Sequence, residues 1–230
     1  MPTTRSTGRA QGGRQGQPLV YFGLVSDLPV ELARPLAARL ASALDVEGKI
    51  PRALDTLGPI AGRDVVLVGA GEAQRHRLAS LGGRLRDAEA IDPTAPSSWQ
   101  LPAESADAVV SVWSAFRGVN AAELAEADRV LRPDGRLLVV HDYGRDDVSR
   151  VLGDQPAYSV WSRRDGPFLS AGFRIRVVHC WWTFGSIDEA RDFLGDAFGE
   201  RGRAVGETLK RPRLSYNVAI YHRTRGNGAG

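Results

Sequence analysis

Cysteine and long apolar runs are scarce in this chain of 230 residues. The single cysteine, Cys180, excludes an internal disulfide and any zinc site built from several cysteines. No apolar run approaches the roughly 20 residues that cross a membrane, and the N-terminal residues lack the apolar stretch of a signal peptide. We therefore expect a cytoplasmic protein with no membrane partner and no metal site.

An excess of positive charge is also missing from most of the chain. Arg5, Arg9 and Arg14 account for the whole formal net charge of +3, and the remaining Lys and Arg side chains are balanced by Asp and Glu. This balance gives no case for a nucleic-acid partner. We expect residues 1–17, which are basic and rich in Gly and Gln, to form a disordered leader.

The most informative stretch runs from Asp64 to Glu72. A continuous Val/Leu run leads into Gly69-Ala70-Gly71 and then into a helical pattern, as in a buried strand of a parallel sheet. Glycines at such an exit let the backbone turn sharply and approach a ligand, with the N-terminus of the next helix directed at it. An ordinary strand-to-helix turn remains the alternative on these residues alone.

Residue spacing predicts the other elements. We expect a first group of helices at 30–44, despite Pro35, at 50–57 and at 72–81. Capping boxes at Asn120/Glu123 and Ser186/Glu189 start two more, the first running to Leu131. Strands are expected at 85–91 (weakly), 108–113, 136–140, 173–184 and 215–221, with a loop over 93–106 and, over 145–171, a helix at most in the first part. Alternating strands and helices predict an α/β protein with an open, mostly parallel sheet, helices on both faces and an antiparallel last strand.

The segment from Leu101 to Gly144 resembles class I, Rossmann-like methyltransferases that use S-adenosylmethionine, and among them the methyltransferase type 11 group. It combines Leu-Pro, an Asp before a Val-rich strand, a helix ending in Arg-Val-Leu-Arg-Pro-Asp-Gly, and the strand Leu-Leu-Val-Val. The resemblance covers about residues 50–225. It implies a methyltransferase-like domain over 61–225, preceded by a helical flank or cap over 18–60 and followed by a tail at 226–230. It also implies that S-adenosylmethionine is the cofactor and that Gly69, Ala70, Gly71 and Glu72 form its loop.

The sequence departs from the family pattern near that loop. Leu67 replaces the usual acidic residue, and Ala73 replaces the third glycine. Only about thirty residues separate Gly71 from Leu101, so one strand-helix unit is missing or much reduced. In the family that this chain resembles, the corresponding region supplies the acid that binds the cofactor's ribose. Asp92 is our candidate for it, Glu89 is the second, and a simple turn before Pro93 is the alternative.

Ligands of open α/β sheets bind at the carboxyl ends of the strands, which places His141 and Tyr143 near the reacting groups. His141 is the candidate base and Tyr143 would orient the acceptor. Trp113 or Phe116 would pack on adenine or substrate, and packing in the core is the alternative for both. For His141 the alternative is a hydrogen-bonded histidine at the end of a strand. His179 and Cys180 point to opposite faces of a strand and make a poor metal pair.

The favoured function is a methyltransferase acting on a small molecule. The Asn-Pro-Pro-Tyr-like tetrapeptide of nucleobase methyltransferases is absent after Trp113. The alternative is a degenerate methyltransferase-fold protein that acts as a binding or assembly subunit, and exposed tryptophans at 181–182 in a homodimer interface would favour it. A nicotinamide-dependent reductase would need a glycine near Gln74.

Overall fold

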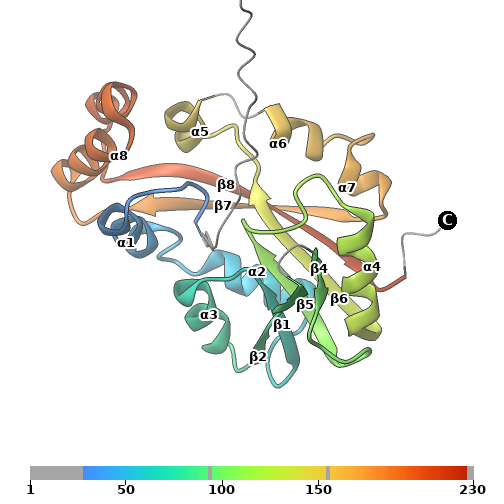
Figure 1. Ribbon diagram of the computed structural model, residues 1–230. Coiled ribbons are helices and arrows are strands. Elements are labelled where there is room, and N and C mark those ends of the chain that lie inside the picture. Colours follow the sequence, from blue (N-terminus) through green and yellow to red (C-terminus); the bar gives the residue numbers. More distant parts are fainter. Residues whose placement is uncertain (1–27, 93–94, 154–155, 227–230) are drawn as a thin grey trace, which may run out of the picture.

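The computed structural model describes residues 28–92, 95–153 and 156–226, without the side chains of 90–97, 156 and 157. Its centre is a six-stranded sheet in the order β2-β1-β5-β6-β8-β7 (Figure 1). The first four strands are parallel, while β8 is antiparallel to both β6 and β7. The predicted α/β class with an antiparallel last strand is confirmed. The strands are β1 (Asp64–Val68), β2 (Arg84–Asp87), β5 (Ala106–Val112), β6 (Leu131–Asp142), β7 (Arg174–Thr183) and β8 (Arg213–Thr224).

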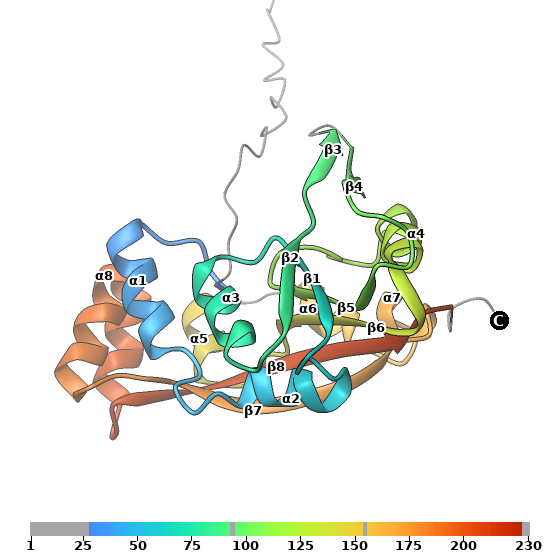
Figure 2. The same cartoon turned by 90° about the horizontal axis from the view of Figure 1, so that it is seen from below.

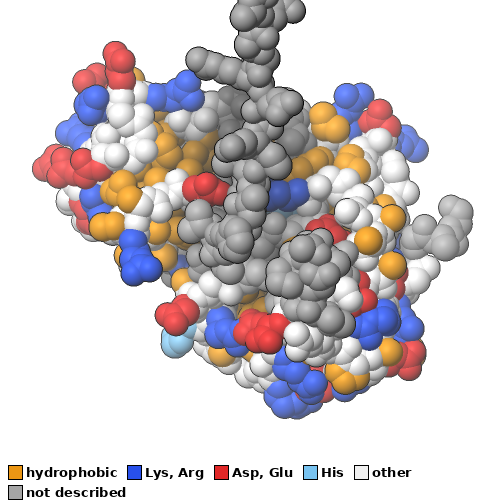
Figure 3. All heavy atoms as spheres, viewed as in Figure 1, with side chains coloured by type: hydrophobic (Ala, Val, Ile, Leu, Met, Phe, Trp, Pro, Cys, Tyr) orange, Lys and Arg blue, Asp and Glu red, His pale blue; other side chains and the backbone are white. Residues whose placement is uncertain are grey.

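Helices cover both faces of this sheet. One apolar cluster unites the sheet with α1 (Arg34–Ala43), α2 (Lys49–Leu57), α3 (Glu72–Ala79), α5 (Asp147–Leu152) and α8 (Ile187–Thr208). The second lies under α4 (Ala121–Val130), α6 (Pro156–Trp161) and α7 (Pro167–Ser170). Figure 3 shows hydrophobic side chains gathered over α1 and α8, which lie against each other. No helix in the described part of the chain is long and apolar enough to span a membrane.

The first helix is shorter than predicted. It begins at Arg34 rather than at residue 30, because Pro35 sits in its first turn, where the missing N–H costs nothing. It ends at Ala43, and Leu44 then bridges to Trp182. The carboxylate of Asp45 accepts hydrogen bonds from the N–H groups of Lys49 (3.0 Å) and Ile50 (2.8 Å), so it starts α2. The apolar run at 19–25 lies outside the described residues.

The region between β2 and β5 differs most from expectation. The single strand predicted at 85–91 is two strands, and the predicted loop at 93–106 contains another. β3 (Ala90–Asp92) pairs with β4 (Ala95–Trp99) as a separate antiparallel hairpin that stands away from the main sheet (Figure 2). Glu126 of α4 accepts a hydrogen bond from the Trp99 N–H at 2.7 Å, which holds the end of the hairpin. Short polar strands such as these have too little apolar periodicity to be distinguished from a loop.

Two other segments also contain more helix than predicted. Residues 145–171 form α5, α6 and α7, each of six residues or fewer, a length at which helical periodicity is weak. α8 begins as expected after Ser186, whose side chain accepts a hydrogen bond from the Glu189 N–H. It then turns at Gly199, where φ is +60°, and continues to Thr208.

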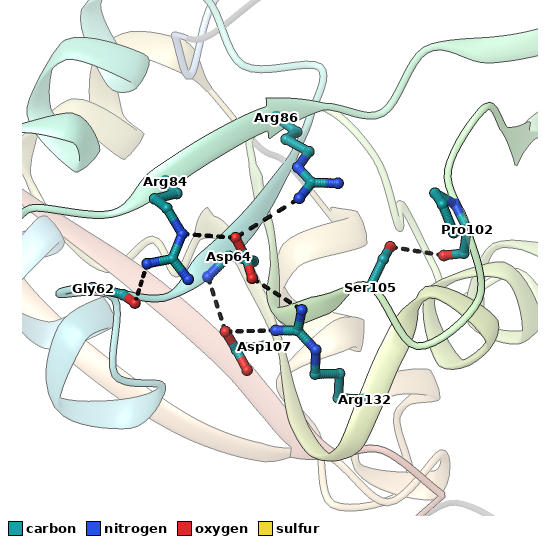
Figure 4. A network of polar contacts seen from close by, with 8 residues as sticks. All are labelled: Gly62, Asp64, Arg84, Arg86, Pro102, Ser105, Asp107 and Arg132. Atoms are coloured by element: carbon teal, nitrogen blue, oxygen red, sulfur yellow. Dashed lines mark hydrogen bonds and ion pairs between the residues drawn. The ribbon is translucent and has the colours of Figure 1, made fainter.

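The amino ends of four strands are tied together by ion pairs (Figure 4). The carboxylate of Asp64 in β1 accepts hydrogen bonds from Arg84 of β2 and Arg132 of β6, both at 2.9 Å. Arg132 also contacts Asp107 of β5 at 2.9 Å. These guanidinium hydrogen bonds hold the pKa of Asp64 well below its ordinary value. These ion pairs hold together the amino edge of the sheet, where the parallel strands begin. The strands end at the opposite, carboxyl edge, where the sequence predicts a ligand.

Candidate functional site

Several residues with positive φ lie at the carboxyl edge of the sheet. After β1, Gly69 has φ of +62°, and after β5, Trp113 and Phe116 have φ of +54° and +60°. After β6, Gly144 and Arg145 have φ of +81° and +60°. A non-glycine residue in this region costs about 1–3 kcal/mol, and such residues cluster at ligand sites. Trp113, Phe116 and Arg145 carry this cost at the edge that the sequence predicts as the binding edge, and Glu104 and Asp134 carry it at the amino edge.

The glycine turn packs closely on the loop after β5. A Cβ atom added at Gly69 would lie 2.7 Å from the Cβ of Ser114, so only glycine fits there. The Ser114 hydroxyl donates a hydrogen bond to the Val68 carbonyl. Gly71 is the N-cap of α3, whose first residue is Glu72, and no side chain caps this helix. The four predicted cofactor-loop residues thus lie together where the free N–H groups of α3 begin, as an anionic or polar ligand requires.

A carboxylate at the end of the neighbouring strand, Asp87, is a further candidate for the ribose that sequence reasoning missed. Asp87 is the last residue of β2 and pairs in register with Leu67 of β1, two residues before Gly69. Its side chain forms an ion pair with Arg75 on α3. The other candidates lie further along: Glu89 is exposed after β2, and Asp92 ends β3 in the hairpin, its side chain outside the described set. The acidic residue at the end of Arg84-Leu85-Arg86-Asp87 could have indicated this site. The prediction of a strand reaching residue 91 placed Asp87 inside the strand instead of at its end.

A buried carboxylate lies at the end of β6. Asp142 is 4% exposed, and its Oδ1 accepts hydrogen bonds from the Trp113 indole N–H at 3.1 Å and from the Tyr216 hydroxyl. Its Oδ2 has no hydrogen-bond partner among the described residues. Burial raises the pKa of Asp142 to about 7, an effect that the two hydrogen bonds and Arg117 only partly oppose and the charge of Asp146 reinforces.

Asp142 lines a small cavity of about 190 Å³. Besides Asp142 and glycines, the lining is mostly hydroxyl-bearing: Tyr143, Ser149, Tyr158, Ser159, Ser162 and Tyr216. Hydroxyl groups both donate and accept, so they suit a polar acceptor. Arg145 and Asp146 also line the cavity and add one charge of each sign. A larger groove of about 650 Å³ lies beyond α5, and Asp142 does not line it.

The two predicted residues of the reacting end lie in different environments. Tyr143 is half-buried and lines the cavity beside Asp142. His141 is 1% exposed and packs its ring against Trp161, with ring centroids 4.8 Å apart. Burial lowers the pKa of His141 to about 3, with a smaller contribution from Arg117. Successive side chains of a strand point to opposite faces, so Asp142, rather than His141, faces the cavity.

The predicted aromatic contacts are mostly in the core. Trp113 and Phe116 are 2% and 0% exposed, and Trp113 acts here through its N–H rather than through an open ring face. Trp182 is also fully buried, against Phe193 and Tyr216, while Trp181 is half-buried beneath the guanidinium of Arg213. The pair at 181–182 is therefore not the exposed tryptophan surface that would favour an assembly subunit.

No protein-family model matches the chain, and the comparison with curated proteins finds no relative. Among solved structures, a protein assigned as a type II methyltransferase from Anaeromyxobacter dehalogenans is 18% identical and has a TM-score of 0.50. The match covers 77% of this chain and 95% of that one. A protein assigned to methyl transfer in antibiotic biosynthesis from Anabaena variabilis is 14% identical over 80% of this chain and 99% of that one, at a TM-score of 0.48. The first match shows the Rossmann-like methyltransferase fold.

Proposed function

We propose that this protein is a methyltransferase that uses S-adenosylmethionine and acts on a small molecule. The observation that supports it best is the convergence on one sheet edge of the glycine turn, Asp87 and the buried Asp142. The similar fold of a protein assigned as a methyltransferase adds support. The cavity of about 190 Å³ suits a small acceptor group.

The residues at the glycine turn fit the cofactor. Gly69 allows close backbone approach, the N–H groups at the start of α3 suit its carboxylate, and Asp87 would accept hydrogen bonds from its ribose hydroxyls. Arg75 already holds the Asp87 carboxylate, so it would position that group. When bound, S-adenosylmethionine supplies an electrophilic methyl group on a sulfonium.

Asp142 would serve as the general base. An O–H or N–H acceptor loses a proton when it gains the methyl group, and a carboxylate with a pKa near 7 is suited to accept it at neutral pH. Tyr216 and Trp113 hold Oδ1 and leave Oδ2 for that proton. Tyr143 and Tyr158 would orient the acceptor. His141 remains a predicted base, but its burial and low pKa do not support that role.

Calorimetric titration with S-adenosylmethionine and S-adenosylhomocysteine tests the cofactor site. We expect micromolar binding, weakened at least tenfold by Asp87→Ala and abolished by Gly71→Arg. Asp92→Ala and Glu89→Ala test the two residues predicted from sequence, and Glu104→Ala, an exposed acid paired with Arg225, is the control. Absence of binding to the folded wild type would contradict the proposal. If Asp92→Ala weakened binding more than Asp87→Ala did, the ribose would be assigned to Asp92 in the hairpin instead.

A further inference from the structure

A second polar cavity lies at the opposite, amino edge of β6. Its volume is about 240 Å³, and it is lined by Arg136, Gly172, Arg174, His222, Arg223 and Thr224. No carboxylate is among these lining residues. Its lining shares no residue with the cavity around Asp142.

Strand register places four of these side chains on one face of the sheet. Arg136 of β6 pairs with Thr224 of β8, and Arg174 of β7 pairs with His222 of β8. Because residues 222 and 224 are two apart on a strand, their side chains point the same way, as do those of their paired neighbours. Gly58, at the end of α2, packs on the Arg136 stem: an added Cβ would lie 3.0 Å from the Arg136 Cβ. The cluster is therefore built on rigid elements.

Within the described residues, the charges of Arg136 and Arg174 have no ion-pair partner. Arg136 donates a hydrogen bond to the Thr224 hydroxyl, and among the described residues no carboxylate lies within ion-pair distance of Arg136 or Arg174. Arg223 is different: it pairs with Asp128 on α4 at 2.8 Å, across the other face. Burial lowers the pKa of His222, and the charges of Arg174 and Arg136 lower it further. Arg136 on β6 and Arg174 on β7 lie on either side of β8, and both charges act on His222 between them. An anion bound here would offset both charges.

We propose that this cavity binds a phosphate group, either inorganic phosphate or the phosphate of a small monoester. Two guanidinium groups, a hydroxyl and an imidazole provide donors from three neighbouring strands, and arginine matches the geometry of phosphate oxygens. The volume exceeds the roughly 30 Å³ of one water and lies below the ~300 Å³ at which drug-sized sites begin. This site does not depend on the proposed methyl transfer.

The test is titration of the full-length protein with inorganic phosphate and with glycerol 3-phosphate, in chloride and in acetate buffers of equal ionic strength. Arg174→Gln should weaken binding at least tenfold. Arg176→Gln is the matched control, because Arg176 is exposed, lies two residues further on the same face of β7, and is absent from the cavity lining. It should change affinity less than twofold. Tighter binding of glycerol 3-phosphate than of phosphate would assign a monoester, and the reverse order would assign the free ion.

An NMR titration of His222 provides a second readout that does not depend on the arginine variants. Phosphate should raise the pKa of His222 in the wild type, because a dianion would oppose the charges of Arg174 and Arg136. Phosphate should leave the ring chemical shifts of His179, on the same strand as Arg174, unchanged at constant pH. Equal weakening by both arginine variants, competition by chloride at equal ionic strength, or an unchanged His222 titration would each overturn the proposal.

Discussion

Replacing Asp142 by asparagine should stabilise the protein, and only at neutral to alkaline pH. In the folded protein the Asp142 pKa is about 7, against an ordinary value of 3.8. The folded state therefore holds this proton more tightly than the unfolded chain does, and ionisation opposes folding. The cost is absent below about pH 4, grows as the pH rises toward 7, and is constant above it.

The two pKa values set the size of the effect. Their difference corresponds to roughly 4 kcal/mol above pH 7. Between pH 5 and pH 8.5 the part of the cost that develops is about 3 kcal/mol. The amide oxygen that Asp142→Asn introduces can still accept from Trp113 and Tyr216, whereas the buried NH₂ group lacks a partner, which costs about 1–3 kcal/mol at every pH. The pH-dependent part therefore isolates the ionisation.

Urea denaturation of the wild type and Asp142→Asn near pH 5 and pH 8.5 measures this difference. The variant should gain about 3 kcal/mol relative to the wild type between the two conditions. Asp165→Asn is the control, because Asp165 is exposed and paired with its near neighbour Arg163. Its effect should be the same at both pH values. If Asp142→Asn were equally destabilising at both, Asp142 would be an ordinary ionised residue and its proposed role as a base would lose its basis.

Three further variants test the surroundings of the site. Gly69→Ala should destabilise the protein by about 1–3 kcal/mol more than Gly62→Ala in thermal melts, because both glycines have positive φ but only a Cβ at residue 69 overlaps Ser114. Equal losses would contradict the contact. His141→Gln should reduce the decrease in the free energy of unfolding as the pH falls below about 6.5. A histidine whose pKa falls to about 3 stabilises the fold fully above about pH 6.5 and progressively less below it. An unchanged acid transition would contradict this. Asp64→Asn should destabilise the protein near neutral pH, and the loss of stability should become smaller as the pH falls below about 4 or as the salt concentration rises. A loss that depends on neither pH nor salt would mean that the ion pairs of Asp64 contribute nothing.

Most of the sheet was predictable because its strands carry strong apolar runs. β1, β5 and β7 lie within a few residues of their expected bounds, and the capping residues Asn120 and Ser186 start α4 and α8 as predicted. The hairpin β3–β4 was not predictable, because Ala90–Trp99 is held by pairing and by Glu126 on α4, neither of which leaves a periodic pattern.

The candidate site was predictable as a place but not residue by residue. The end of β6 was identified, and Tyr143 lines its cavity. Sequence reasoning preferred His141 because of its ordinary pKa, yet burial removes that property and gives a neutral pKa to Asp142 instead. Which side chain of a strand faces the ligand depends on register, and a shift of one residue reverses the assignment. Asp87 was not predicted for a similar reason, since its place beside the glycine turn depends on where β2 ends.

Carboxylates at the two edges of the sheet have pKa values shifted in opposite directions, and this contrast supports a chemical role for Asp142. At the amino edge, hydrogen bonds from Arg84 and Arg132 lower the pKa of Asp64 and make its ionisation favourable for folding. At the carboxyl edge, Asp142 accepts from the neutral donors Trp113 and Tyr216, and burial makes its ionisation unfavourable. A carboxylate retained only for stability would be paired like Asp64. Groups kept at a cost in stability are characteristic of functional sites, so Asp142 is the residue on which activity should depend most.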